Sequence, residues 1–356
     1  MFANNLLRVP EYVSGTREDS FPIRLSSNEN NYGPSPRVIR KIKQLSKLSH
    51  KYPESSYTLL KRAIAKENNI PASKVILGNG SDEIFLNLFL MYLTPNSSLL
   101  TIEKTFTYYK ILASIIGAEV IEAKREKNFS ISCNNILSAM KPSVKILIFP
   151  SPDNPTGVTV DRKCIENILR NIPESTIFIL DEAYFQFVPK SKYWESIELI
   201  DKFPNFIVTR TFSKLYALAG LRLGYGICSE EIAKLYEKMR MPFNISSLAS
   251  ECAIEALADK NYYSKILRKI LRDKRILKHE FKKLGLNVLE KSYGNFLFIQ
   301  GPKDLDKKLL ESGIVIRNLE SFGYDKTYYR ITIGTRKENK ILLECLRKIL
   351  GGTNDN

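Results

Sequence analysis

Lys214 has unusual neighbours for a charged side chain. It occurs in the segment RTFSKLYALAGLRLGYG, among hydroxyl-bearing and small residues, and Arg222 follows eight residues later. A lysine that forms an imine with an aldehyde needs an amine of lowered pKa in a fixed position, and burial and neighbouring cations lower that pKa. Arg222 and the hydroxyls of Thr211 and Ser213 could hold a phosphate beside it. The segment therefore predicts an imine-forming lysine next to a bound phosphate.

Three further segments carry polar residues at the ends of apolar runs. LGNGSDE brings Gly80 and Ser81 to the start of an expected helix, where a glycine turn and free N–H groups suit an anion, although a plain helix cap has the same pattern. ILDEAY contains Asp181 and Tyr184, and SPDNPTG holds Asn154 in a turn constrained by proline. Asp181 could bind a metal or magnesium phosphate, or could hold a protonated ring nitrogen. The lack of companion ligands in the sequence argues against a metal.

These residues together match the requirements of one cofactor. An imine lysine, an acid at a pyridine nitrogen, a phenol or amide at a ring oxygen and a cradle for a phosphate are what pyridoxal 5'-phosphate needs. The two histidines, His50 and His279, exclude a histidine-rich metal centre and offer little for a Ser-His-Asp triad. We therefore expect pyridoxal 5'-phosphate and no metal.

The bulk composition is that of an ordinary globular protein. The chain has 356 residues, of which 44% are hydrophobic and 26% charged, enough for one large domain or two modest ones. Its formal net charge of +16 suits either nucleic-acid binding or a lysine-coated surface that also attracts anionic small molecules. The densest basic run, residues 267–285, predicts an amphipathic helix with a solvated basic face. We favour the solvated surface and expect no nucleic-acid partner.

Neither the apolar runs nor the cysteines indicate a membrane or secreted protein. The apolar run at 84–93 is too short to span a bilayer, and the N-terminus lacks the pattern of a signal peptide. The five cysteines form no C-x-x-C pair, which predicts buried thiols in a reducing compartment rather than a disulfide framework or a zinc site. We expect a cytoplasmic protein without a membrane partner.

Short β-rich runs alternate with longer helical runs over residues 31–240. Strands are expected at 74–77, 98–103, 144–149, 175–184 and 205–214. Because strands that are apolar throughout and separated by helices form parallel sheets covered on both faces, this part predicts an α/β domain. Ligands of such sheets lie beyond the carboxyl ends of the strands. Nearly every polar cluster of the chain falls there, which predicts one shared site.

The pattern changes after residue 240. A helical stretch is followed by expected strands at 294–300, 313–318 and 328–334 and by a last helix at 337–350. We predict a large cofactor-binding domain at 31–240 and a smaller α+β domain at 241–356. Residues 1–30 are expected to form an N-terminal arm that is part of the small domain.

Eight motifs follow one another in a characteristic order over almost the whole chain: YVSGTRE, LSSNENNYGPSP, KYPES, LGNGSDE, NPTG, DEAY, RTFSKLYALAGLRLGYG and YRITIGTRKEN. In these motifs and their spacing the chain resembles the fold-type I pyridoxal-phosphate-dependent aminotransferases (class II) and, within them, the histidinol-phosphate aminotransferases. The resemblance implies a mostly parallel seven-stranded sheet between helices, a smaller α+β domain and a homodimer.

The resemblance also implies a role for each residue around the cofactor ring. Lys214 would form the imine and then move the proton between the substrate and the cofactor. Asp181 would keep the pyridinium protonated, and Tyr184 and Asn154 would bond the phenolic oxygen of the ring. Phe106 would stack on the ring face, although it could equally be a core aromatic residue.

Binding of anions is implied in the same way. Tyr52 would reach the phosphate of the neighbouring subunit, Arg330 would bind the acidic group of the substrate, and Arg317 and Tyr12 would help. Tyr12 and Tyr52 could instead simply pack, and Arg317 could form a surface ion pair. The residues that would hold the cofactor phosphate within the chain are Gly80, Ser81, Thr211, Ser213 and Arg222.

The implied activity is transamination of L-histidinol phosphate with 2-oxoglutarate to imidazole-acetol phosphate and L-glutamate, in histidine biosynthesis. An aromatic amino-acid aminotransferase and a lyase similar to threonine-phosphate decarboxylase remain rivals on the same fold. A non-catalytic DNA-binding regulator is a third rival, but the chain has no residues left for a separate DNA-binding module. Two positions depart from the family pattern: Asp153 replaces a common Asn, and Asn31 replaces a common Pro in a loop that approaches the substrate.

Overall fold

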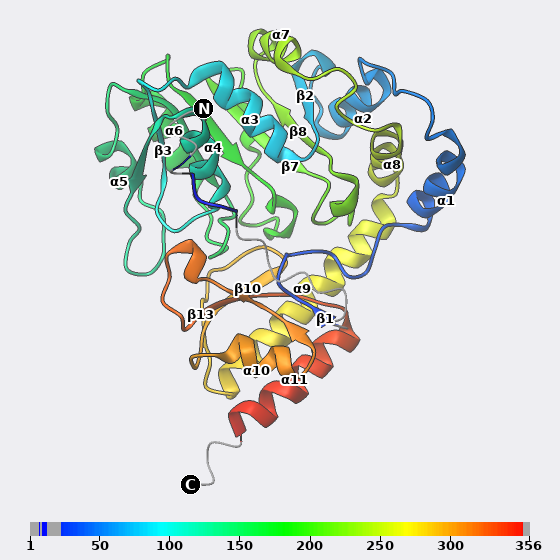
Figure 1. Ribbon diagram of the computed structural model, residues 1–356, viewed down its shortest axis with the longest axis vertical. Helices are drawn as coiled ribbons and strands as arrows, with labels where there is room; N and C mark the ends of the chain where they lie inside the picture. Colours follow the sequence, from blue (N-terminus) through cyan, green and yellow to red (C-terminus); the bar gives the residue numbers. More distant parts are fainter. Residues whose placement is uncertain (1–6, 8, 13–22, 352–356) are drawn as a thin grey trace.

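The computed structural model describes residues 7, 9–12 and 23–351. Residues 13–18 of the motif YVSGTRE and much of the predicted N-terminal arm lie outside this range. Figure 1 shows a large domain and a smaller one, with the long helix α9 (Lys260–Lys283) running from the first into the second.

A seven-stranded sheet forms the middle of the large domain. Its order is β2-β8-β7-β6-β5-β3-β4, with parallel neighbours except that β8 is antiparallel to both β2 and β7. The predicted mostly parallel sheet is therefore confirmed. Its strands are β2 (Val75–Gly78), β3 (Ser98–Ile102), β4 (Glu119–Ala123), β5 (Val144–Pro150), β6 (Ile177–Asp181), β7 (Phe206–Thr211) and β8 (Gly224–Ile227).

Both faces of this sheet are buried against helices. Successive residues of a strand point to opposite sides, so neighbouring residues contribute to different apolar clusters. In β5, Ile146 and Ile148 belong to the apolar cluster that includes α3, α4 and α7. Leu147 and Phe149 belong to the cluster on the other side, with α2, α5, α6 and α8. The helices of the large domain are α1 (Pro36–Leu45), α2 (Thr58–Asn68), α3 (Ser81–Tyr92), α4 (Tyr108–Ile116), α5 (Cys133–Ser138), α6 (Arg162–Asn171), α7 (Glu230–Met239) and α8 (Ser247–Ala258).

The small domain combines short strands with three helices. A four-stranded antiparallel sheet has the order β12-β13-β10-β9, and β1 (Ile23–Arg24) pairs in parallel with β11 (Ile314–Val315). Residues 23–24 therefore join the small domain. The remaining elements are α9, β9 (Asn287–Val288), β10 (Phe296–Gln300), α10 (Leu305–Glu311), β12 (Arg317–Asn318), β13 (Tyr328–Thr332) and α11 (Arg336–Gly351).

The predicted boundaries at residues 30 and 240 stay a prediction. Helix α8 begins beyond residue 240 and packs against α1 and α2 of the large domain. Strands β4 and β8 were not expected from the sequence. β8 has the sequence GYGI, whose glycines weaken the strand signal, and β4 is an edge strand with glutamates at two of its five positions.

The expectation of free thiols is wrong for two cysteines. Cys133 in α5 and Cys164 in α6 form a disulfide, with their Cα atoms 5.6 Å apart. The two helices pack against each other, a proximity that is not apparent from the sequence, where the two cysteines are 31 positions apart. Cys228 and Cys252 are buried thiols, and Cys345 is a partly buried one.

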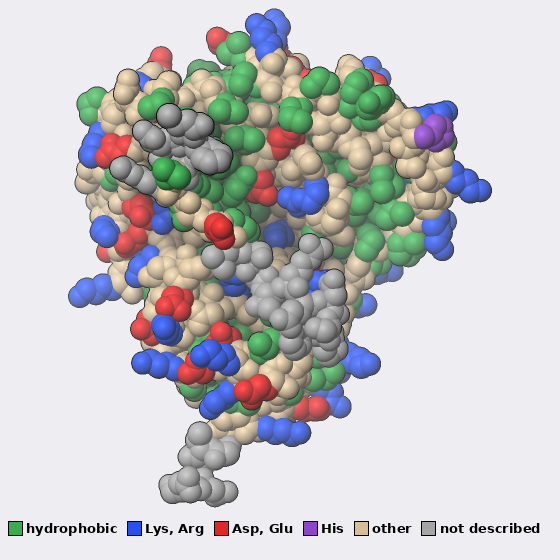
Figure 2. All heavy atoms as spheres, in the orientation of Figure 1, with side chains coloured by type: hydrophobic (Ala, Val, Ile, Leu, Met, Phe, Trp, Pro, Cys, Tyr) green, Lys and Arg blue, Asp and Glu red, His purple; other side chains and the backbone are tan. Residues whose placement is uncertain are grey.

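The basic residues are spread over the surface. On the face shown in Figure 2, Lys and Arg side chains are scattered around the outline of both domains and interspersed with Asp and Glu. In the part of the chain that the structure describes, no helix is long and apolar enough to cross a membrane. Within that same part, no group of three His, Cys, Asp or Glu residues could hold a metal ion.

Candidate active site

An open cavity of about 200 Å³ lies at the carboxyl ends of the parallel strands, between the two domains. The register of the sheet creates it: Pro150 of β5 pairs with Asp181 of β6, and Thr211 of β7 pairs with Gly224 of β8. The cavity is lined by Tyr12, Ser26, Ser27, Asn28, Ser81, Asp82, Phe106, Pro150, Asn154, Asp181, Ala183, Tyr184, Thr211, Ser213, Lys214, Ala219, Arg222, Arg317, Phe322 and Arg330.

Lys214 follows β7 and points into this cavity. Its Nζ donates a hydrogen bond to the backbone oxygen of Ser27 at 3.1 Å and lies 5.6 Å from the centre of the Tyr184 ring. The loop that carries it is closed by a backbone hydrogen bond from Phe212 to Leu223. Lys214 is therefore held by the fold with its amine at the cavity wall.

A cradle for an anion forms where α3 begins. Gly80 caps α3 with a φ of +77°, and Arg222 comes close enough that a Cβ on Gly80 would lie 2.5 Å from its Nη2. A Cβ on Gly224 would lie 2.4 Å from the backbone nitrogen of Ser81. The missing side chains thus leave the helix N–H groups and the guanidinium accessible to a phosphate. Arg222 Nη2 is paired with Asp82 at 3.1 Å.

Thr211 and Ser213 complete the cradle from the end of β7. The backbone nitrogen of Ser213 donates to the hydroxyl of Thr211 at 3.1 Å, and both side chains line the cavity. The structure therefore brings together all five residues that were expected to hold a phosphate within the chain.

Asp181 is a buried carboxylate without a positive partner. It accepts hydrogen bonds from Tyr109 Oη at 2.6 Å, from the backbone nitrogen of Ala183 at 3.1 Å and from Thr209 Oγ1 at 3.5 Å. None of these partners, all among the described residues, is a cation. Burial raises the pKa of Asp181 to about 6, against the lowering effect of these hydrogen bonds. A cationic ring nitrogen in the cavity would supply the missing charge.

Tyr184 and Asn154 lie between Asp181 and the small domain. The hydroxyl of Tyr184 accepts a hydrogen bond from Asn28 Nδ2 at 2.8 Å. Asn154 Oδ1 accepts one from Arg330 Nη1. Both side chains are buried and line the cavity, so their polar atoms are fixed at its wall.

Arg330 is a buried cation whose partners are uncharged. It donates to Asn154 and, at 2.5 Å, to the backbone oxygen of Ser26, while its buried Nε has no hydrogen-bond partner among the described residues. Burial lowers the pKa of Arg330 to about 10, because desolvation disfavours the charged form. Strand β13 of the small domain thus places at the cavity a buried arginine whose charge is not balanced by its hydrogen-bond partners.

Arg317 lies opposite Arg330 in the strand pairing of β12 with β13. Its Nη2 donates to Ser321 Oγ at 3.1 Å, and its guanidinium lies 5.6 Å from the ring of Phe322. Burial lowers the pKa of Arg317 as well. The alternative of a surface ion pair does not apply to this residue, which is 9% exposed, and its role at the substrate stays a prediction.

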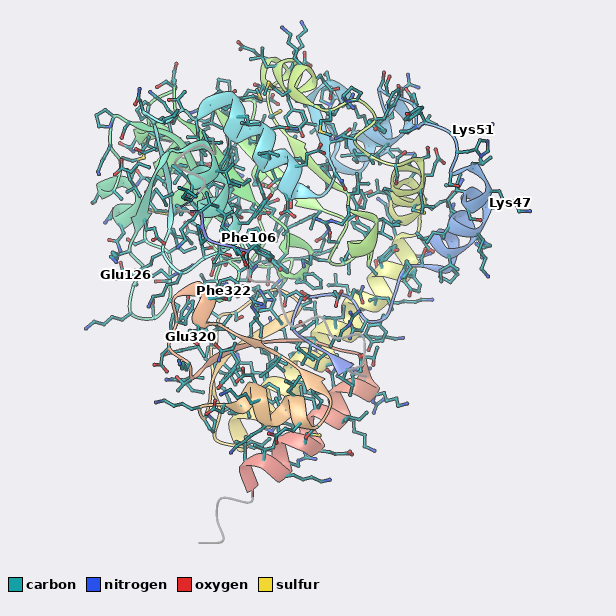
Figure 3. The ribbon with its side chains drawn as sticks, viewed as in Figure 1. Lys47, Lys51, Phe106, Glu126, Glu320 and Phe322 are labelled. Atoms are coloured by element: carbon teal, nitrogen blue, oxygen red, sulfur yellow. A yellow bond between two sulfur atoms is a disulfide. The ribbon has the colours of Figure 1, made fainter. Side chains whose placement is uncertain are left out.

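Aromatic rings close the cavity on two sides. Phe106 and Tyr12 contact each other edge to face, with their centres 6.5 Å apart. Burial raises the pKa of Tyr12, which Arg317 and Arg330 partly offset. Figure 3 shows Phe106 at the lower edge of the large domain and Phe322 just below it on the small domain. Aromatic rings from both domains therefore line the same cavity.

Tyr52 and Asn31 are not among the residues that line this cavity. Tyr52 is 81% exposed and stacks on Phe243, with ring centres 4.7 Å apart. Asn31 donates hydrogen bonds to Glu338 at 2.9 Å and to the backbone oxygen of Arg24 at 3.4 Å. Asn31 thus lines a neighbouring groove with Ser213 and Ala219, next to the cavity rather than in it.

Several residues that shape the site were not expected from the sequence. Asn28 holds Tyr184, Tyr109 holds Asp181, and Asp82 holds Arg222. Asp82 occurs in LGNGSDE, so its neighbours in the sequence were a usable signal. Phe322 and Tyr109 carried no such signal, because an aromatic residue beside a helix or strand usually belongs to the core.

The donor set fits pyridoxal 5'-phosphate. The cavity offers an amine, a glycine-lined cradle with an arginine, and a buried carboxylate without a cation, each suited to a different part of that molecule. The residues that would hold the group are Lys214, Asp181, Tyr184, Asn154, Phe106, Gly80, Ser81, Thr211, Ser213 and Arg222.

Comparisons with known proteins agree with this donor set. Residues 22–346 match the model of the family "Aminotransferase class I and II". The histidinol-phosphate aminotransferase of Moorella thermoacetica is 34% identical over 332 residues, which cover 92% of this chain and 85% of that protein.

Solved structures extend the comparison to three dimensions. The histidinol-phosphate aminotransferase of Sinorhizobium meliloti, solved in complex with pyridoxal-5'-phosphate, superimposes with a TM-score of 0.87 and 25% identity, covering 94% of this chain and 92% of the other. The enzyme of the same name from Clostridium acetobutylicum has a TM-score of 0.85 and 26% identity, covering 93% and 99%. The chain therefore belongs to the aminotransferase class I and II family and, within it, to the pyridoxal-phosphate-dependent histidinol-phosphate aminotransferases.

Proposed function

We propose that this aminotransferase moves an amino group between L-histidinol phosphate and 2-oxoglutarate, giving imidazole-acetol phosphate and L-glutamate, as a step of histidine biosynthesis. The observation that carries the proposal is the buried Arg330, which has only uncharged partners, in the same cavity as Lys214. The names of the curated and solved relatives support the choice of substrate.

Some of the expected cofactor-binding residues balance its charges, and others fix its position. Pyridoxal 5'-phosphate, when bound, supplies an aldehyde that takes up and releases the amino group and a protonated ring that withdraws electrons from the substrate. Asp181 would keep the ring nitrogen protonated, since its buried carboxylate would gain a cationic partner there. Tyr184 and Asn154 would bond the ring oxygen. The residues that would hold the phosphate are Gly80, Ser81, Thr211, Ser213 and Arg222.

Lys214 is the acid–base of the reaction in this proposal. Its amine would take the proton from the Cα of the amino donor and return it when the acceptor is aminated, because its loop fixes the amine at the cavity wall. Phe106, which lines the same cavity, would pack against the bound cofactor and exclude water. The proton thus passes between defined atoms rather than through solvent.

Arg330 binds the acidic group of each substrate in turn. One substrate carries a phosphate and the other carboxylates, and arginine binds both groups through two parallel hydrogen bonds. Arg317, next to Arg330 across the strand pair, and Tyr12 assist with the phosphate. The positive potential of the two guanidiniums draws anions to the cavity.

We also propose a homodimer in which Tyr52 reaches the cofactor phosphate of the neighbouring subunit. Tyr52 is exposed and does not line the cavity of its own chain. The rings of Tyr52 and Phe243 present an apolar surface together with Met241, which is 66% exposed. Such a surface is suited to association with another chain.

Mixing two inactive variants tests the dimer. Tyr52→Ala and Lys214→Ala subunits, unfolded and refolded together, should regain activity, because a mixed dimer contains one site with both native residues. Each variant refolded alone is the control. A mixture no more active than the two controls would contradict sharing of the site.

A panel of amino donors tests the substrate. The parent enzyme should convert L-histidinol phosphate and glutamate faster than phenylalanine or tyrosine, as followed by cofactor absorbance in half-reactions. A preference for the aromatic amino acids would favour the aromatic aminotransferase, and carbon dioxide release from threonine phosphate would favour the lyase. Lys214→Ala should lose turnover and the visible absorbance band, and turnover at the parent rate would contradict the role of Lys214.

We propose a cytoplasmic location without a nucleic-acid or membrane partner, in keeping with a biosynthetic enzyme that acts on small phosphorylated metabolites. The scattered positive charge of the surface in Figure 2 supports a role in solubility rather than a nucleic-acid groove. Binding to DNA that persists at high salt would contradict this proposal.

A further inference from the structure

Asp153, in the motif SPDNPTG, belongs to a fully buried ion pair. Its carboxylate lies 2.9 Å from Arg125 Nη2, an electrostatic contact in which Nη2 makes no hydrogen bond within the described residues, and the two side chains are 0% and 4% exposed. A buried pair is costly to desolvate and contributes little net stability, but loss of one partner is strongly unfavourable. The pair does not line the cavity, so its role depends on what it holds in place.

The guanidinium of Arg125 joins separate segments of the large domain. Its Nε donates to the backbone oxygen of Glu103 at 2.8 Å, and its Nη1 donates to the backbone oxygen of Phe129 at 3.2 Å. The same side chain faces Asp153. Arg125 therefore connects the loops after β3, β4 and β5.

Asp153 fixes two residues next to the cavity wall. It accepts hydrogen bonds from Thr105 Oγ1 at 2.7 Å and from Thr156 Oγ1 at 2.5 Å. Thr105 directly precedes Phe106, and Asp153 directly precedes Asn154. One carboxylate thus positions the two loops that carry the ring-packing phenylalanine and the partner of Arg330.

The loop after β4, which carries Phe129, reaches the small domain. Phe129 adopts a φ of +67°, a strained conformation for an aromatic residue, and its ring packs edge to face on Phe298 and Tyr328 at 5.1 and 5.9 Å. Phe322, which lines the cavity, belongs to the same apolar cluster as Phe298. Figure 3 shows the loop marked by Glu126 reaching down beside this part of the small domain.

We propose that Arg125 and Asp153 are positioning residues for transamination. Their ion pair fixes the positions of Phe106 and Asn154 relative to the aromatic cluster of the small domain that contains Phe322. The inference rests on the proposed function, because it concerns the same site. It predicts that the three loops loosen together when the pair is broken.

The substitution Asp153→Asn breaks the ion pair with little change in side-chain size. The new amide can still accept a hydrogen bond from Thr156, but it leaves the buried Arg125 without an anion. Arg125→Met combined with Asp153→Asn removes both charges and should relieve that cost. Leu346→Ala, at a buried core position of α11 that does not line the cavity, is a control that destabilises without touching the pair.

Hydrogen exchange on the cofactor-free protein is the first readout. In Asp153→Asn, exchange should rise in residues 103–107, 124–130 and 151–157 together, and the double variant should restore part of the protection. In the cofactor-loaded enzyme, kcat/KM for the glutamate half-reaction should fall roughly tenfold or more, because small misplacement of positioning groups slows catalysis. Leu346→Ala should change neither at a temperature where all variants are folded.

Three results would overturn the inference: increased exchange confined to 151–157, a double variant no better than Asp153→Asn, or a control with the same pattern of losses. If the parent enzyme itself fails to transaminate, the proposed function fails instead. The exchange pattern of the cofactor-free variants still decides whether the pair couples the three loops.

Discussion

Replacing Arg330 with methionine should weaken the enzyme strongly while leaving the cofactor-free protein at least as stable as the parent. Most replacements of buried residues lower activity and stability together. Here the two should separate, because Arg330 is a buried cation with uncharged partners among the described residues, and we propose that it binds a ligand rather than supports the fold.

The magnitudes follow from the environment of Arg330. Lowering its pKa from 12.5 to about 10 corresponds to on the order of 3 kcal/mol of unfavourable burial, at about 1.4 kcal/mol for each tenfold change in protonation. Its hydrogen bonds to Asn154 and Ser26 return about 1 kcal/mol each. The change to methionine should therefore leave the free energy of unfolding equal to the parent's or raise it by about 1 kcal/mol.

The loss of activity should be much larger. Removing one partner of a buried ion pair costs about 3–5 kcal/mol, and the substrate anion loses that partner in the variant. At about 1.4 kcal/mol per factor of ten, kcat/KM should fall roughly 100-fold to several thousandfold. Arg330→Lys keeps the charge but loses the paired hydrogen bonds, and should fall between the two.

Stopped-flow half-reactions with glutamate and L-histidinol phosphate would measure the activity, and denaturant unfolding of the cofactor-free protein would measure the stability. Arg336→Met, at an exposed position at the start of α11, is the matched control and should change neither. An Arg330→Met variant with kcat/KM within about threefold of the parent would refute the assignment of the anion site. A cofactor-free variant much less stable than the parent would refute the reasoning from burial.

Three smaller predictions concern the cofactor side of the cavity. Burial raises the pKa of Asp181 to about 6, so its ionisation opposes folding; relative to Asp181→Asn, the cofactor-free parent should lose on the order of 3 kcal/mol as pH rises from about 4 to 7, as measured by denaturant unfolding. Equal pH profiles would contradict this. Gly80→Ala places a Cβ 2.5 Å from Arg222 Nη2 at a φ of +77° and should weaken cofactor binding roughly tenfold in titrations of the cofactor-free protein; unchanged affinity would show that Arg222 is not needed in that position. Asn28→Ala removes the hydrogen bond to Tyr184 and should lower kcat/KM about fivefold, and a variant as fast as the parent would mean that Tyr184 is held by other contacts.

The candidate cofactor-binding residues could be proposed from the sequence because their motifs are local. Gly80 and Ser81 are adjacent, Thr211, Ser213 and Lys214 lie within four positions, and each group follows a short apolar run. Parallel strands bring such carboxyl ends to one edge of a sheet whatever the order of the strands. The prediction of one shared site therefore did not need the register.

The side chains that hold these residues in place could not be predicted from the sequence. Asn28 and Tyr184 are 156 positions apart, and Arg330 and Asn154 are 176 apart. A strand with two glycines, β8, was likewise missed because its neighbours β2 and β7, rather than its own propensity, stabilise it. The disulfide between Cys133 and Cys164 was missed for a similar reason, since only helix packing brings the two residues together.

The sequence by itself determined the α/β architecture, the cofactor and a set of candidate residues around it, because hydrophobic periodicity and short motifs are properties of neighbouring residues. Only the tertiary structure decided which charges lack a partner. Arg330 and Arg125 are both buried arginines, yet the first has only uncharged acceptors and the second faces Asp153. That difference arises from which strand ends and loops meet across the two domains, and it is the basis for proposing a substrate role for Arg330 and a positioning role for Arg125.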